Sequence, residues 1–256
     1  MKTNWRRLIP ALAGLVVLAA AAPAFAAFED VEVSPRVRAL GGAFSALPAD
    51  AYTPFHNPAA LAWTVDPAGA ASFVRPFGYD FSEQIVASGT MGLGKWGGLG
   101  VGVRHFGVEY HGENLTGETT VKLAHGFQLL RDMQSTLAAG WAVNLYHLDY
   151  GMSVDADPAR PGSGIDPGSA TAFGIDLSAQ ATIYARTRVG FYALNVNNPS
   201  IGSTDKEDLI RRVGAGVAYV PYKGVTTALD ISSQLGEAVQ FRGGTEFEVN
   251  DILRLR

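Results

Sequence analysis

The chain has 256 residues and no cysteine, with 47% hydrophobic but only 17% charged residues. The lack of cysteine excludes disulfides, thiolate metal sites and thiol catalysis. Few charges and 30 glycines are untypical of a soluble enzyme, because ordinary soluble domains carry about 25% charged residues and about 7% glycine.

The first 26 residues have the organisation of a secretory signal peptide. Lys2, Arg6 and Arg7 form a positive region, an apolar run covers 8–22, and 24–26 reads Ala-Phe-Ala, a small-x-small cleavage pattern. The apolar run is shorter than the roughly 20 residues of a transmembrane helix. An uncleaved inner-membrane anchor is the alternative. The sequence therefore predicts export of the mature chain.

Removal of the signal peptide makes the chain more acidic. Cleavage after Ala26 takes away three of the 20 Lys and Arg residues and none of the 24 Asp and Glu residues, so the net charge falls from −4 to −7. Nucleic-acid binding needs a basic patch. We therefore expect no nucleic-acid partner.

Residues 27–68 lack the alternating pattern that follows them. Gly41-Gly42 permits a tight bend or a close backbone approach. Asn57-Pro58 is typical of a turn opener, and 58–63 resembles a short helix with proline in its first turn. We expect an ordered plug packed inside a larger structure, with a flexible leader as the alternative.

Residues 69–256 consist of segments in which apolar residues alternate with small or polar ones. The clearest is 173–183, where apolar residues take the odd positions. Such a strand has one apolar and one polar face. Many of these segments match the 9–11 residues that a tilted strand needs to cross a bilayer. The other segments lie near 69–76, 82–93, 96–108, 121–129, 137–145, 188–197, 211–220, 224–233 and 238–249.

Short and long connections alternate between the segments, as in outer-membrane barrels with short periplasmic turns and longer external loops. The short turns are expected at 94–95, 131–132, 186–187 and 222–224, and the longer loops near 109–117, 149–171 and 197–210. Aromatic residues near strand ends, among them Tyr146, Tyr184 and Tyr222, are interpreted as membrane-interface girdles.

These patterns predict an all-β fold, an antiparallel transmembrane β-barrel in the outer membrane of a Gram-negative-type bacterium. Residues 1–26 would be the signal peptide, 27–68 a plug or hatch, and 69–256 the barrel. About eleven strands are recognisable, and 250–256 resembles a turn and the start of another strand. Because bacterial single-chain barrels have even strand numbers, we expect a C-terminally truncated sequence. A smaller complete barrel and a soluble periplasmic β-sandwich binding module are the alternatives.

Polar residues at the alternate positions of the strands point to the lumen if the apolar face meets lipid. Many of their neighbours are glycine or alanine, which leaves room for a plug. The residues assigned to the lumen are Lys122, Gln128, Asn144, Asp176, Gln180 and Arg242, together with Ser178, Asp230, Gln240 and Glu246.

Nothing in the sequence indicates an enzyme, a cofactor site or a metal site. The five histidines show no metal-ligand spacing, and there is no Gly-x-Ser-x-Gly motif. Two weaker alternatives are a catalytic group built on His147 and Asp149 with a distant serine, and a calcium site in the loop that carries Asp155, Asp157 and Asp166.

Residues 36–63 resemble the start of the PorV/PorQ and FadL-like outer-membrane proteins. The matching stretches are Arg-Ala-Leu-Gly-Gly-Ala-Phe at 38–44, Ala-Asp-Ala at 49–51 and Asn-Pro-Ala at 57–59. His56 stands where an aromatic residue is common and Ala60 where glycine is common. The resemblance implies a barrel of 14 strands when complete, with a hatch carrying Gly41, Gly42, Asp50, Asn57, Pro58 and Ala59.

The resemblance also implies two functions. A PorV/PorQ-type protein would serve protein export by type IX secretion, with secreted cargo proteins as partners. A FadL-like channel would take up long-chain fatty acids or other hydrophobic compounds. Either would contact membrane lipid, lipopolysaccharide and the outer-membrane assembly machinery.

Overall fold

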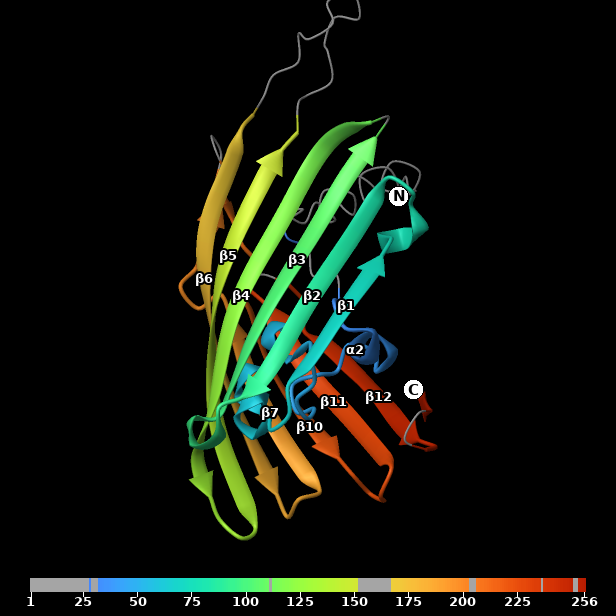
Figure 1. Cartoon of the computed structure of the whole chain (residues 1–256), viewed down its shortest axis with the longest axis vertical. Helices are drawn as coiled ribbons and strands as arrows, with labels where there is room; N and C mark the ends of the chain where they lie inside the picture. The colour runs from blue at the N-terminus through green and yellow to red at the C-terminus, as the bar shows by residue number, and fades with distance from the viewer. Residues whose placement is uncertain are drawn as a thin grey trace, which may run out of the picture.

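Eleven strands form one continuous antiparallel sheet that curves around the N-terminal part of the chain (Figure 1). The computed structural model describes residues 28, 32–110, 112–151, 167–202, 206–235, 237–250 and 253–256. The expected signal peptide, 1–26, lies outside these residues. None of the helices in the described ranges is long and apolar enough to cross a membrane.

The strands follow chain order, with one exception. β7 pairs with β10 because β8 (Ser200–Ile201) and β9 (Glu207–Asp208) form a separate two-stranded sheet between them. The strands of the large sheet are β1 (Ala68–Val74), β2 (Ser82–Gly92), β3 (Gly98–Tyr110), β4 (Glu113–Arg131), β5 (Ser135–Tyr150), β6 (Ser169–Ile183), β7 (Thr187–Leu194), β10 (Arg212–Tyr219), β11 (Val225–Gln234), β12 (Gln240–Glu248) and β13 (Arg254–Leu255).

The two ends of the sheet differ in their connections. At the turn end, strands are joined through 93–97, 132–134, 184–186, 220–224 and 249–253. At the other end, the loop end, β5 ends at Tyr150 and β6 begins at Ser169, while β7 ends at Leu194 and β10 begins at Arg212. The external loop expected at 109–117 is wrong, because β3 continues to Tyr110 and β4 already begins at Glu113. The register of the two strands shifts between Val108 and Glu109, as at a β-bulge, and the pairing then continues to Tyr110 and Glu113.

The strand register separates an apolar from a polar face. Val143 on β5 lies opposite Leu123 and Ile175, whereas the next residue, Asn144, lies opposite Lys122 and Gly174. Val143 is 42% exposed, while Asn144 is fully buried. Successive side chains point to opposite faces of a strand, so the alternation in the sequence becomes an exposed apolar face and a buried inner face.

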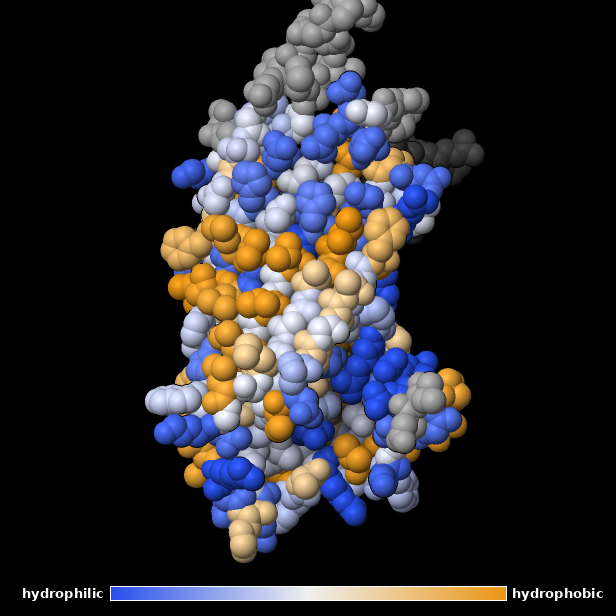
Figure 2. All heavy atoms as spheres, in the orientation of Figure 1, coloured by the Kyte–Doolittle hydropathy of each residue, from blue (hydrophilic) through white to orange (hydrophobic). Residues whose placement is uncertain are grey.

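The exposed face is rich in large apolar side chains, carried by β2 to β7 and by β10 to β12. Figure 2 shows them as a band across the middle of the visible face, with hydrophilic residues above and a mixture of both kinds below. One continuous sheet with this outer face is not the predicted alternative of a β-sandwich, which packs two sheets face to face. That alternative is wrong.

The N-terminal segment, residues 32–64, packs against the inner face of the sheet. It contains α2 (Pro35–Ala39) and the 3₁₀ helices η1 (Thr53–Phe55) and η2 (Pro58–Trp63); η3 (Pro76–Gly78) and η4 (Gly94–Trp96) lie between strands. Glycines make room for it: a β-carbon at Gly126 or Gly140 would overlap the backbone of η2. The predicted helix at 58–63 is thus confirmed.

The segment also contacts both ends of the strand order. Ser72 Oγ on β1 donates a hydrogen bond to the Val33 carbonyl, and Arg36 on α2 makes two hydrogen bonds to the carboxylate of Glu246 on β12. Among the described residues, no pairing joins β1 to β13. The N-terminal segment therefore contacts strands at both edges of the sheet, and in Figure 1 α2 lies beside β1 and β12.

Candidate functional site

Asp230 on β11 holds the middle of the N-terminal segment. Its Oδ2 accepts hydrogen bonds from the backbone N–H groups of Phe44 and Ser45, at 2.8 and 2.9 Å, and from Ser45 Oγ at 2.7 Å. Asp230 is 5% exposed. Hydrogen bonds to a buried carboxylate are stronger than those between neutral groups, so this contact fixes the backbone at Phe44 and Ser45.

The Asn-Pro-Ala motif at 57–59 forms the start of the 3₁₀ helix η2. Asn57 Oδ1 accepts from the Ala59 N–H, and Asn57 Nδ2 donates to the Ser45 carbonyl. The Ala59 N–H also contacts Ser178 Oγ on β6 at 2.9 Å. Asn57 is therefore an N-cap for η2, where Pro58 takes the first position and needs no hydrogen-bond donor.

Gly41, Gly42 and Asp50 shape the approach to this motif. Gly41 and Gly42 have positive φ angles of 66° and 85°, which residues with a β-carbon adopt only with strain. A β-carbon at Gly41 would also meet the Gly243 backbone on β12. Asp50 accepts from the Tyr52 N–H at 2.9 Å and lies 3.5 Å from Arg36.

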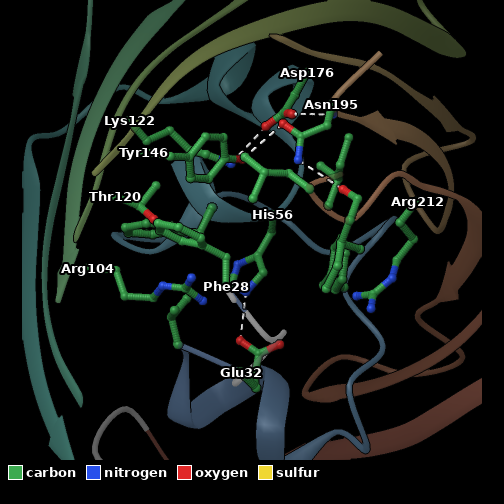
Figure 3. Close-up of a pocket in the computed structure, with 16 residues that line it drawn as sticks. Phe28, Glu32, His56, Arg104, Thr120, Lys122, Tyr146, Asp176, Asn195 and Arg212 are labelled. Atoms are coloured by element: carbon green, nitrogen blue, oxygen red, sulfur yellow. Dashed lines mark hydrogen bonds and ion pairs between the residues drawn. The ribbon is translucent and has the colours of Figure 1, made fainter. Parts of the chain in front are cut away.

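A cavity of about 100 Å³, the first cavity, lies between the N-terminal segment and the wall towards the loop end. In Figure 3, Asp176 and Lys122 lie on one side of it and His56 and Glu32 on another, while Arg212 lies apart from both pairs. Its apolar lining consists of Phe28, Val33, Phe44, Phe55, Leu194, Leu209 and Ile210, and its polar lining of Glu32, His56, Arg104, Thr120, Lys122, Tyr146, Asp176, Asn195 and Arg212.

A buried ion pair joins two strands of the wall beside this cavity. Lys122 Nζ on β4 lies 2.8 Å from Asp176 Oδ2 on β6, and the side chains are 8% and 1% exposed. Removing two charges from water is costly, so such a pair depends on further hydrogen bonds. Asp176 Oδ1 accepts one from the Asn195 N–H, at 2.9 Å. Lys122 Nζ also lies 5.8 Å from the Phe55 ring centre.

Asn195 extends this network to two further elements. Its Oδ1 accepts from the Tyr146 hydroxyl at 2.9 Å, and its Nδ2 donates to the Ile210 carbonyl at 2.9 Å. Its φ angle is 53°, a left-handed conformation that asparagine tolerates better than most residues. The polar side of the cavity is thus held by hydrogen bonds that join β4, β5, β6 and the turn after β7.

His56 and Glu32 form the second polar group, contributed by the N-terminal segment itself. His56 Nε2 lies 2.8 Å from Glu32 Oε1, and the ring centres of His56 and Phe44 are 5.0 Å apart. Burial lowers the pKa of His56, but the Glu32 carboxylate, with a smaller contribution from Asp50, outweighs burial and holds this pKa above its usual value.

Phe28 occupies the loop-end side of the first cavity. Its ring meets the Tyr146 ring edge to face, with centres 5.1 Å apart, and its N–H donates to Glu118 Oε2 at 2.8 Å. The side chain is 6% exposed. Phe28 therefore contributes an aromatic ring to the lining at this side of the first cavity.

The six residues assigned to the lumen all lie on the inner side of the sheet, but not in one place. Lys122 and Asp176 meet at the first cavity, whereas Asn144 is buried in the wall nearby. Gln180 Nε2 donates to the Leu47 carbonyl, and Gln128 Nε2 to the Ala62 carbonyl. Arg242 packs against Gly42. Three of the six thus contact the N-terminal segment and two line the cavity.

Sequence reasoning missed several cavity residues and misplaced one. Phe28, Glu32, Arg104, Asn195 and Arg212 were not assigned to a site, and Tyr146 was wrongly counted in the aromatic girdle. Tyr146 is 8% exposed and faces inwards. Its position two residues after Asn144 on β5 could have revealed this, because alternate residues share a face. Tyr184 and Tyr222, by contrast, are exposed.

The described residues do not assemble either of the two weaker alternatives, the catalytic group or the calcium site. His147 Nδ1 contacts Thr171 Oγ1 at an exposed position of the wall. No group of three or more His, Asp or Glu side chains placed to hold a metal occurs among the described residues. The candidate calcium ligands Asp155, Asp157 and Asp166 lie outside them.

Comparison with known proteins identifies the fold. No protein-family model and no curated protein matches the chain. Among solved structures, it is similar to a CymD monoaromatic hydrocarbon channel, with a TM-score of 0.52 and 12% identity over 88% of this chain and 82% of that one. It is also similar to a TodX monoaromatic hydrocarbon channel deltaS2 mutant, with a TM-score of 0.50 and 14% identity over 84% and 78%. The predicted FadL-like antiparallel β-barrel fold is thereby confirmed.

Proposed function

We propose that this chain is an outer-membrane channel of FadL-like type that passes small hydrophobic compounds through the first cavity. The observation that carries the proposal is a cavity inside a barrel with an apolar outer face; phenylalanine and aliphatic side chains line one part of this cavity, and polar side chains, most of them hydrogen-bonded, line the rest. Residues 27–68 would be the hatch and 69–256 the barrel wall, and lipid would cover the outer face. Binding and passage need no catalytic group, so no enzymatic activity is assigned.

The size of the cavity favours a single ring over a long chain. Its volume is about 100 Å³, of the same order as the engineered apolar cavity of about 150 Å³ that binds benzene. Two of the similar solved structures are described as monoaromatic hydrocarbon channels. Monoaromatic hydrocarbons are therefore the proposed substrate class, in preference to long-chain fatty acids.

A PorV/PorQ-type role in protein export stays a second prediction. It came from the resemblance at 38–44, but Leu40, Ala43 and Phe44 are buried against the wall. Packing within the fold therefore accounts for the apolar residues of 38–44, without a protein partner. Co-purification of secreted proteins or secretion components with the chain would favour that role.

Uptake of labelled toluene by cells that produce the full chain tests the proposal. We expect saturable uptake above that of cells without the chain, and a several-fold loss in Leu194→Trp, which fills the cavity. Phe191→Trp is the matched control, because Phe191 lies on the same strand and is 49% exposed on the outer face. Equal uptake in all strains would contradict the proposal. A heat-dependent gel-mobility shift checks that each variant folds into a barrel.

A further inference from the structure

A second cavity, of about 550 Å³, lies between the N-terminal segment and the turn end of the wall. Thr90 is near the end of β2, Thr182 is the next-to-last residue of β6 and Arg188 is the second of β7. All three line this cavity, opposite Pro48, Asp50 and Thr64 of the segment. The second cavity is therefore on the other side of the N-terminal segment from the first.

The second cavity has polar groups without partners in a lining that also includes Trp63, Val65 and Ala68. The Thr64 and Thr136 hydroxyl oxygens are buried and have no hydrogen-bond partner among the described residues, and Asp50 and Arg188 add charged groups. Water in a cavity of sufficient size satisfies such groups. The second cavity thus has room for water as well as for an apolar compound.

A narrow gap lies between the two cavities. It is lined by Phe44 and His56, which also line the first cavity, and by Pro48 and Asp50, which also line the second. The three spaces consequently form a row through the segment. The distance between the two cavities follows from β6, which carries Asp176 at the first cavity and Thr182 at the second. At about 3.3 Å per residue, these two residues lie roughly 20 Å apart.

The gap is closed in this structure. Its volume of about 10 Å³ is close to that of a single water site. The Phe44 ring packs on His56, His56 is held by Glu32, and the Phe44 backbone is held by Asp230. Because the Phe44 side chain borders both the first cavity and the gap, a change in its rotamer alters the width of the gap while the backbone stays in place.

We propose that Phe44 and His56 form a gate, through which single-ring apolar compounds pass from the first cavity across the N-terminal segment into the second. The route ends at the turn end of the barrel. This inference rests on the proposed function and specifies the path: the compound crosses the segment and does not have to displace it from the wall. The smaller first cavity, with its phenylalanine side chains, binds the compound, and the larger second cavity, which has room for water, releases it.

A substitution that fills the gap tests the route. Ala60 lines the gap and is 2% exposed, so Ala60→Leu places extra carbons there. We expect toluene uptake to fall roughly tenfold, since overpacking a closed interior is costly, while toluene binding by the purified protein persists. Ala62→Leu is the control: Ala62 lies on the same helix, is 4% exposed and packs beside Ala138, away from the gap. Equal losses in the two variants would overturn the gate.

The absence of cysteine permits a second test that does not depend on uptake. Thr182→Cys places a single thiol in the second cavity, and benzyl methanethiosulfonate is a single-ring apolar reagent for it. In intact cells, we expect the added Ala60→Leu to slow labelling of this thiol roughly tenfold, for the same steric reason. A thiol at Val189, which is 40% exposed on the outer face, should be labelled at an unchanged rate.

The outcomes separate this inference from the proposed function. If the unmodified chain neither binds nor takes up toluene, the proposed function fails and the gate with it. If uptake is saturable but Ala60→Leu changes neither uptake nor the labelling of the thiol at 182, the channel stands and the gate is wrong. Loss of both in Ala60→Leu alone, with the heat-dependent mobility shift retained, supports the gate.

Discussion

Two buried carboxylates of the barrel wall, Asp176 on β6 and Asp230 on β11, serve different parts of the molecule. Asp176 is bound by Lys122 of β4 and by the Asn195 N–H at the end of β7. Asp230 accepts three hydrogen bonds from Phe44 and Ser45 of the N-terminal segment. One carboxylate therefore joins strands to each other, and the other joins the wall to the segment inside it.

The chemistry of the partners matches this division. Asp176 has a charged partner, so loss of either member leaves a buried charge without compensation. Asp230 has neutral donors, two amides and one hydroxyl, which water can satisfy if the segment moves. The wall is thus held by an interaction that is costly to break, while the segment is held by one that water can replace.

The largest effect is expected from Asp176→Ala. It leaves the Lys122 ammonium, whose side chain is 8% exposed, without its counter-charge, and breaking such a pair costs about 3–5 kcal/mol. We expect the free energy of unfolding to fall by this amount in denaturant titrations of the detergent-solubilised barrel.

The double variant Lys122→Met with Asp176→Leu is the control for this prediction. It removes both charges and keeps the volume, which often restores most of the lost stability. If the double variant is as unstable as Asp176→Ala, the stability comes from the hydrogen bonds to Asn195, and the comparison of the two carboxylates no longer rests on charge.

A smaller and more local effect is expected from Asp230→Ala. Phe44 N–H, Ser45 N–H and Ser45 Oγ lose their acceptor, but water can satisfy these neutral donors once the segment moves, so the total cost stays at about 1–3 kcal/mol. We expect protease cleavage within 32–64 while the barrel keeps its heat-dependent mobility shift. Ser232→Ala, a buried substitution on the same strand, is the control. Unchanged protease resistance of the segment would contradict a specific role for Asp230.

The fold was predictable because its main determinant is local. Alternation along each strand decides which face is buried, and Lys122, Asn144 and Asp176, which it assigned to the lumen, are buried. Turn positions followed from glycine and polar residues in the same way. The misplaced Tyr146 shows the limit: an aromatic residue near a strand end was interpreted by its type, although its position two residues after Asn144 indicated the inner face.

The candidate site was less predictable, because its residues meet only through tertiary packing. Glu32 and His56 are 24 residues apart, and Phe28 lies 118 residues from its aromatic partner Tyr146. No sequence period connects such positions. The resemblance included Phe44 at the end of 38–44 and Asn57 at the start of 57–59. It gave no indication that Phe44 and His56 border both the first cavity and the gap.

The smallest effect concerns pH and the His56–Glu32 pair. The pKa of His56 is raised in the folded chain above its unfolded value of about 6.5. The pair therefore contributes stability that is fully present below the unfolded pKa and is lost as the pH rises through the folded one. Glu32 and Asp50 favour the imidazolium, whereas burial and Lys122 oppose it.

Because burial opposes the charge, we expect a contribution on the order of 1 kcal/mol, below that of a favourable charge-assisted bond. Protease resistance of residues 32–64 measured against pH should decline above the folded pKa in the unmodified chain. It should be independent of pH in His56→Gln, and Glu32→Gln should move the decline to lower pH. A pH-independent segment in the unmodified chain would mean that the His56–Glu32 pair does not help to hold it, and the comparison would then reduce to the two carboxylates.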